Sequence, residues 1–285
     1  MIHRTPPATD SHWIDTPTRF VEAAGVRFAY RRSGPSEGVP VVLLNHWAAN
    51  LDNFDPRIVD GLAIDRPVYA LDYRGVGASG GDAPVTIAAM ASDTIAVIRA
   101  LGLTQVDLIG FSLGGFVAQD VIRLAPDLIR RLVLAGTGPA GGVGIERVGP
   151  VSWPLMAKGV VTLKDPKTYL FFTSTANGRA AAKAFLTRLK ERKADRDKAV
   201  TPRVLLRQLK AIKNWGEQPP QDLAALRLPV LIANGDQDIM VPTENSTGMA
   251  ERIPGAELVI YPDAGHGGIF QNHAAFVARA RRFLA

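Results

Sequence analysis

The strongest chemical signal in the sequence is a serine flanked by glycines, in Gly110-Phe111-Ser112-Leu113-Gly114. This spacing fits the G-x-S-x-G pattern, in which a serine occupies a sharp strand-to-helix turn. Glycines are required two residues to either side because side chains there would collide in so tight a turn. An apolar run, Val106 to Ile109, precedes the pattern and an amphipathic stretch follows it. The sequence therefore predicts Ser112 as a nucleophile.

A serine hydroxyl is a poor nucleophile without a base, and a histidine with an ordinary pKa of about 6.5 suits that role. His266 lies in a glycine-containing loop, Asp263 to Gly268, directly after an apolar run that predicts a strand. A loop at the carboxyl end of a parallel strand is well placed to face a site. We therefore predict His266 as the general base. The other histidines lie near the chain start, after an early strand or in a terminal helical stretch: His3, His12, His46 and His273.

The histidine needs a carboxylate that fixes its tautomer and stabilises its charged form. The loop after the Val230 to Ala233 run offers two, Asp236 and Asp238. We predict Asp238 because it lies further out on the loop, whereas Asp236, beside Gly235, is better placed to hold the turn by bonding its own backbone. The resulting chain order of serine, acid and histidine is the order that accompanies this serine motif.

Acyl transfer also requires donors for the developing oxyanion, each worth roughly 3 to 4 kcal/mol. The backbone amide of Leu113 is one candidate. The second is expected in the loop after the Val41 to Leu44 run, where position alone selects the amide of Trp47. A tryptophan ring that packs the wall of a pocket is compatible with an amide acting as donor.

The apolar pattern predicts a doubly wound α/β fold with a mostly parallel sheet. An alternating hairpin over Arg19 to Ala23 and Val26 to Arg31 comes first. Short continuous apolar runs, typical of parallel strands covered on both faces, then alternate with helical stretches such as Thr86 to Gly102. These runs are Val41 to Leu44, Val68 to Leu71, Val106 to Ile109, Leu132 to Ala135, Val230 to Ala233 and Leu258 to Tyr261.

The alternation of strands and helices stops after Ala135 and resumes at Val230. Glycines between 136 and 144 open this interval and Pro219 and Pro220 close it, as expected for a hinged insertion. Two amphipathic helices are predicted inside it, around 182–189 and 204–212. We predict a helical cap over 139–218, inserted into a core formed by 1–138 and 219–285.

Together these residues resemble the α/β-hydrolase superfamily, in its serine-nucleophile branch with a helical cap. Asp72-Tyr73-Arg74-Gly75-Val76-Gly77-Ala78-Ser79 is similar to the family's D-x-R-G-x-G-x-S turn, which is mainly structural there, so Asp72 and Arg74 are not assigned to chemistry. The resemblance implies that 151–215 lies over the active site as a cap.

One departure from the family pattern concerns the predicted oxyanion loop. Family members usually carry His-Gly before the oxyanion residue, whereas this chain has Asn45-His46. A side chain replaces the glycine, which bears on the geometry of the Trp47 amide. Two roles stay open for His46: a buried structural histidine, or a side chain that reaches the pocket and contacts substrate.

The resemblance implies hydrolysis of a carboxylic ester of a small molecule through an acyl-enzyme, with no metal or organic cofactor. A serine nucleophile argues against branches that use an aspartate, the haloalkane dehalogenases and epoxide hydrolases. Carbon-carbon bond hydrolysis and cofactor-free perhydrolysis, also called haloperoxidase activity, use the same triad and stay as alternatives. Outside enzymes, a small-molecule receptor on the same fold is a further alternative.

Composition narrows the partners and the compartment. The chain has no cysteine, which excludes disulfides and thiolate metal sites. It has no apolar run long enough to span a bilayer and no apolar leader, so we expect a cytoplasmic protein. No nucleic-acid motif is present. The sequence leaves open whether the chain forms a homo-oligomer.

Positive charge is concentrated in one segment. From Val151 to Trp215 there are 15 Lys and Arg against 4 Asp and Glu, whereas the whole chain has 33 against 27. The rest of the chain is therefore net acidic. Either the segment presents a solvated helical surface, or it attracts an anionic substrate.

Overall fold

The structure, a computed structural model, describes residues 12–285; residues 1–11, including His3 and the start of the predicted core, lie outside the described part. Within residues 12–285, eight strands form one sheet. The strands are β1 (Arg19–Ala23), β2 (Val26–Ser33), β3 (Val41–Leu44), β4 (Val68–Leu71), β5 (Val106–Phe111), β6 (Ile129–Ala135), β7 (Val230–Gly235) and β8 (Glu257–Tyr261). Their order is β1-β2-β4-β3-β5-β6-β7-β8. The β1–β2 and β2–β4 pairs are antiparallel, and every later pair in this order, from β4–β3 to β7–β8, is parallel. The predicted hairpin and mostly parallel sheet are therefore confirmed.

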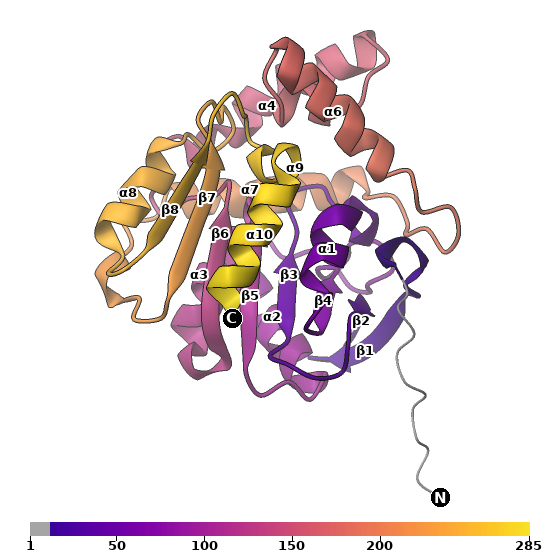
Figure 1. The fold of residues 1–285 in the computed structure, drawn as a ribbon, viewed down its shortest axis with the longest axis vertical. Helices are drawn as coiled ribbons and strands as arrows, with labels where there is room; N and C mark the ends of the chain where they lie inside the picture. Colours follow the sequence, from indigo (N-terminus) through magenta and orange to yellow (C-terminus); the bar gives the residue numbers. More distant parts are fainter. Residues whose placement is uncertain (1–11) are drawn as a thin grey trace, which may run out of the picture.

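Helices cover both faces of the sheet, with α1 (Pro56–Leu62) and α10 (His273–Leu284) in front in Figure 1 and α2 (Ile87–Ala100) and α3 (Leu113–Leu124) behind. The remaining core helices are α8 (Glu244–Arg252) and α9 (Gly268–Gln271), with short 3-10 turns η1 (Trp13–Asp15), η2 (Leu51–Asn53), η3 (Pro126–Leu128) and η5 (Leu223–Ala225). Because helices pack on both faces, every residue of β3, β5 and β7 is buried. This burial explains their continuous apolar sequences.

Strand β6 begins three residues before the predicted start at Leu132. The three added residues include Arg130 and Arg131, which are half-buried and break the apolar pattern. The Arg130 guanidinium pairs with the buried carboxylate of Asp107 at 2.7 Å, and Arg131 donates to the carbonyl of Phe283. Tertiary partners therefore extend the strand beyond the apolar run.

The interval between β6 and β7 is helical. It contains η4 (Ile145–Arg147), α4 (Val148–Val161), α5 (Lys167–Leu170), α6 (Ala176–Arg188) and α7 (Pro202–Gly216). Helices α6 and α7 correspond to the two that periodicity predicts, whereas α4 and α5 were not predicted. α4 has almost no polar residues to define a face and carries Pro154 inside, so no helical period is visible in its sequence. Figure 1 shows α4 and α6 at the top, beyond the end of the sheet. The domain boundaries at 139 and 218 stay a prediction.

Arginines of this inserted segment bind the core. The Arg188 guanidinium pairs with Asp55 at 2.6 Å and also donates to the carbonyl of Phe270. Arg192, which is buried, donates to the carbonyls of Ile14 and Thr16 at 3.0 and 2.9 Å. Much of the segment's arginine charge therefore attaches the segment to the core.

Membrane crossing is not indicated for the described helices. Within residues 12–285, none is both long enough and apolar enough to span a bilayer.

Candidate active site

Ser112 occupies the turn between β5 and α3, with a left-handed φ of 55° and ψ of −117°. A Cβ on Gly110 would lie 2.4 Å from the carbonyl oxygen of Gly114, and one on Gly114 would lie 2.1 Å from the carbonyl oxygen of Leu44. Real side chains do not approach so closely, so both positions require glycine. The turn is anchored from β6, because the Ser112 amide donates to the carbonyl of Ala135 at 2.9 Å.

His266 and Asp238 form a buried hydrogen-bonded pair. The distance from His266 Nδ1 to Asp238 Oδ2 is 2.7 Å, and both side chains are almost inaccessible to solvent. Because a carboxylate oxygen only accepts, Nδ1 carries the proton and Nε2 presents a lone pair. Within the described residues His266 Nε2 has no hydrogen-bond partner. Its ring also contacts Phe111, with ring centroids 5.0 Å apart.

The two candidate carboxylates of the β7 loop lie in different environments. Asp238 Oδ1 accepts from the amides of Met240 and Val241 at 2.9 and 3.0 Å, which fixes its orientation. Asp236 is exposed and its Oδ1 accepts from the amide of Ala264 at 3.1 Å. Asp238 therefore contacts His266, whereas Asp236 joins the acid loop to the histidine loop.

The loop after β3, residues 45–50, contains both predicted positions Trp47 and His46. The Trp47 ring is buried, and its Nε1 donates to the carbonyl of Leu205 in α7 at 2.9 Å. The backbone amides of Trp47 and Leu113 donate no hydrogen bond within the described residues. Both amides therefore stay free to donate to another oxygen.

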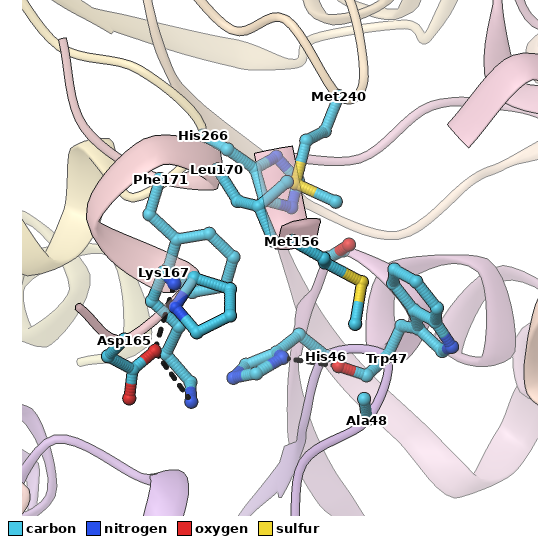
Figure 2. A pocket seen from close by; sticks show the side chains of 12 residues that line it. His46, Trp47, Ala48, Met156, Asp165, Lys167, Leu170, Phe171, Met240 and His266 are labelled. Carbon is cyan, nitrogen blue, oxygen red and sulfur yellow. Dashed lines mark hydrogen bonds and ion pairs between the residues drawn. The ribbon is translucent and has the colours of Figure 1, made fainter. Parts of the chain in front are cut away.

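One small cavity, of about 120 Å³, brings the predicted residues together. Its wall is mainly apolar, with Ser112, His266, His46, Asp165 and Lys167 as polar or charged members, and Figure 2 shows the side chains around it. Ser112 and His266 line this cavity without a hydrogen bond between them, a common arrangement in hydrolases without substrate. The lining residues are His46, Trp47, Ala48, Ser112, Met156, Asp165, Pro166, Lys167, Leu170, Phe171, Met240 and His266.

Eight of the twelve lining residues were not predicted as site residues from the sequence. Met156, Lys167 and Phe171 come from the inserted segment, where no motif marks them. For Lys167, the indication was that it belongs to the segment with a surplus of basic residues, which we considered as a site of attraction for an anionic substrate. Apolar residues such as Phe171 carry no signal of this kind, because their role depends on which part of the core they contact.

His46 is buried, and its ring packs edge-on against those of Phe111 and Phe171, with centroid distances of 5.6 and 5.0 Å. Nδ1 lies 2.7 Å from the carbonyl oxygen of Trp47. Burial, and next the positive charge of Lys167, lower the pKa of His46 to about 3. The side chain is therefore both buried, as a structural histidine would be, and part of the cavity wall.

A second, larger cavity of about 950 Å³ adjoins the first, and Asp165 and Leu170 line both. Its wall contains cationic side chains of the inserted segment: Lys158, Lys164, Arg179, Lys183 and Lys190. The segment's arginines mostly bind the core, whereas four of the nine lysines in 151–215 line this cavity. No group of three or more His, Cys, Asp or Glu suited to a metal ion occurs in the described residues.

A family model and a solved structure that are similar to this chain carry the same fold description. Residues 39–273 match the family described as "alpha/beta hydrolase fold". Among solved structures, an alpha/beta hydrolase fold protein from Chitinophaga pinensis is 35% identical, with a TM-score of 0.91, and the match covers 96% of this chain and 99% of that chain.

Named relatives are more distant. The "Putative carbamate hydrolase RutD" of Rhizobium rhizogenes is 26% identical over 79% of this chain and 85% of its own length. The pimeloyl-[acyl-carrier protein] methyl ester esterase of Neisseria meningitidis is 27% identical over 89% of this chain and 96% of its own. Both names describe hydrolases, of a carbamate and of an ester.

Proposed function

Because the chain belongs to the α/β-hydrolase fold family and is a hydrolase, we propose that it cleaves a carboxylic ester of a small molecule through Ser112, His266 and Asp238. The observation that carries this proposal is the 2.7 Å hydrogen bond between His266 Nδ1 and Asp238 Oδ2. It leaves the lone pair of His266 Nε2 unpaired in the cavity that Ser112 lines. That lone pair is the group that a serine nucleophile requires.

In the proposed reaction, Ser112 Oγ attacks the ester carbonyl while His266 Nε2 takes the hydroxyl proton. His266 then returns the proton to the leaving alcohol, and an acyl group remains on Ser112. A water molecule, deprotonated by the same Nε2, attacks the acyl-enzyme; the bond from the acyl carbon to Ser112 Oγ then breaks, His266 returns the proton to Oγ, and the acid is released. Asp238 holds the ring and stabilises the imidazolium formed in each half-reaction.

The amides of Leu113 and Trp47 are the proposed donors to the oxyanion. Support comes from their lack of partners within the described residues and from the positions of Leu113 at the start of α3 and of Trp47 beside the cavity. The amino end of a helix also carries partial positive charge, which favours a developing anion.

The two cavities suggest how the substrate is divided. The 120 Å³ cavity accommodates a short acyl group, and the adjoining 950 Å³ cavity offers space and positive charge to the rest of the molecule. We propose that the substrate carries an anionic group on its larger part, because lysines there attract anions at long range.

The test is turnover of nitrophenyl esters with acyl chains of increasing length. Ser112→Ala should lower kcat by at least about 10³-fold, because the other groups cannot replace the nucleophile. Ser92→Ala, a change on the exposed face of α2, is the matched control and should keep wild-type activity. A preference for short acyl chains is expected from the volume of the small cavity.

If the protein cleaves none of these esters, the ester proposal is wrong. Two alternatives use the same side chains and would then be tested directly: β-diketones as substrates for carbon-carbon bond hydrolysis, and an acid with peroxide for perhydrolysis. Equal activity of the Ser112→Ala variant and the wild type would contradict a serine nucleophile.

A further inference from the structure

His46 presents an unpaired acceptor to the small cavity. Its Nδ1 lies 2.7 Å from the carbonyl oxygen of Trp47, and a carbonyl oxygen only accepts, so Nδ1 carries the proton. Nε2 therefore has a lone pair. This atom is buried and has no hydrogen-bond partner within the described residues. A buried acceptor without a partner favours any ligand that supplies a proton donor.

The environment keeps His46 neutral, so that Nε2 remains an acceptor. Burial is the main reason that its pKa falls to about 3, and Lys167 lowers it further. Figure 2 shows Nε2 on the side of the ring that faces Lys167 and Asp165, away from the hydrogen bond to Trp47. Lys167 Nζ and Asp165 Oδ1 are 3.7 Å apart, so a cation and its counterion line the same wall.

We propose that His46 determines specificity for an acyl group that carries a hydroxyl, which donates to His46 Nε2 while the ester carbonyl lies at Ser112. This inference rests on the proposed ester hydrolysis. The chemistry of the wall favours a neutral donor such as a hydroxyl: a carboxylate has no proton to donate, and the paired charges of Lys167 and Asp165 leave no net negative charge to stabilise an ammonium group. An unsubstituted acyl group leaves Nε2 unpaired, which sites built for a hydroxyl strongly disfavour.

The test uses methyl esters, in which only the acyl part can carry the second polar group. Esters of 2-, 3- and 4-hydroxy acids of four to six carbons are compared with their methoxy analogues, which keep the oxygen but lack the proton. For the best-placed hydroxyl, kcat/KM should exceed that of the methoxy analogue by about 100-fold.

The His46→Phe variant separates a specificity role from a structural one. Phenylalanine keeps an aromatic ring packed against Phe111 and Phe171 but has neither the Nε2 acceptor nor the Nδ1 donor to the Trp47 carbonyl. The ratio of kcat/KM between the hydroxy ester and its methoxy analogue should fall to about twofold or less, whatever the change in overall rate. Loss of activity toward all esters in equal proportion would indicate a structural role and overturn the inference.

A binding measurement keeps this inference separable from ester hydrolysis. Calorimetry on Ser112→Ala with the intact hydroxy and methoxy esters should give Kd values that differ by at least tenfold. Selective binding without wild-type turnover would uphold the His46 subsite and overturn the ester proposal. Ser112-dependent turnover with no preference for the hydroxyl would uphold ester hydrolysis and overturn the His46 subsite. If neither turnover nor selective binding is observed, both proposals are overturned.

Discussion

The two loops that supply the proposed polar groups are held by different parts of the molecule. The acid loop, 236–241, is held by the core: the Gln237 amide donates to the carbonyl of Ala264 at 2.9 Å, and Asp238 accepts from amides of its own loop. The loop at 45–50 is held by the inserted segment. Trp47 Nε1 and the Ala48 amide donate hydrogen bonds to α7, and the Asn50 side chain donates to the carbonyl of Lys198.

This difference indicates that the two halves of the site depend on different structural elements. The Asp238 loop is held within the core, whereas the His266 loop also bonds the inserted segment, because the Gly267 amide donates to the carbonyl of Phe171 at 2.7 Å. The position of the Trp47 amide depends additionally on how the inserted segment packs. Substitutions in α7 should therefore affect the oxyanion half, because α7 bonds Trp47 and Ala48.

The largest effect should come from breaking the acid–base half. Asp238→Asn removes the carboxylate that selects the Nδ1–H tautomer of His266, and kcat should fall by about 10⁴-fold. Asp236→Asn, on the same loop, is the control and should keep kcat within about tenfold, because within residues 12–285 the Asp236 carboxylate bonds the Ala264 amide and not His266. Steady-state kinetics of the two variants measures the comparison, and the opposite ranking would move the acid to Asp236.

The next effect should come from the oxyanion half. Ala48 has a left-handed φ of 58°, and its amide donates to Oε1 of the buried Gln208 at 3.0 Å. Gln208→Met leaves that amide unpaired and loosens the Trp47 amide, so kcat should fall by about 10- to 100-fold. Lys213→Met, an exposed change on the same helix, should leave kcat unchanged. Retained activity in Gln208→Met would show that α7 does not position the loop.

A moderate effect on stability is expected at the contact between segment and core. Asp197 of the segment bonds the amide of Leu51, and its carboxyl lies beside that of Asp72, which is buried. Burial, and next Asp197, raise the pKa of Asp72 well above its ordinary value. The folded protein therefore binds a proton that the unfolded chain releases above about pH 4.

This difference in proton binding determines the direction in which stability changes with pH. Stability from Asp72 is fully present below the ordinary aspartate pKa and is lost as the pH rises toward the raised value in the folded state. Asp72→Asn should flatten the dependence of Tm on pH and raise Tm at pH 8 by a few degrees. Asp82→Asn, which changes an exposed carboxylate paired with Arg203, should leave the profile as in the wild type. An unchanged profile in Asp72→Asn would contradict the assignment.

The smallest effect concerns the lysines beside the larger cavity. The KM of an anionic ester should rise by about two- to fivefold between low and high ionic strength, because salt screens exposed charges. A neutral analogue should show no such change. Lys183→Gln should reduce the salt dependence, and equal salt effects on both esters would exclude electrostatic attraction of substrate.

Local spacing in the sequence was sufficient for the sheet, the serine turn and the two loops that carry Asp238 and His266. These features depend on period-2 or continuous apolar patterns and on glycines that a tight turn requires, which are properties of neighbouring residues. The extension of β6 through Arg130 and the unpatterned helix α4 were missed because contacts distant in sequence stabilise them.

Only the tertiary structure decided what surrounds the serine. The placement of Lys167 and Phe171 in the cavity wall, the hold of Gln208 on Ala48 and the orientation of the His46 ring all join the inserted segment to the core. A residue that acts through a partner more than 100 positions away leaves no periodic or spacing signal near itself. Its identity becomes informative only when the fold brings the two segments into contact.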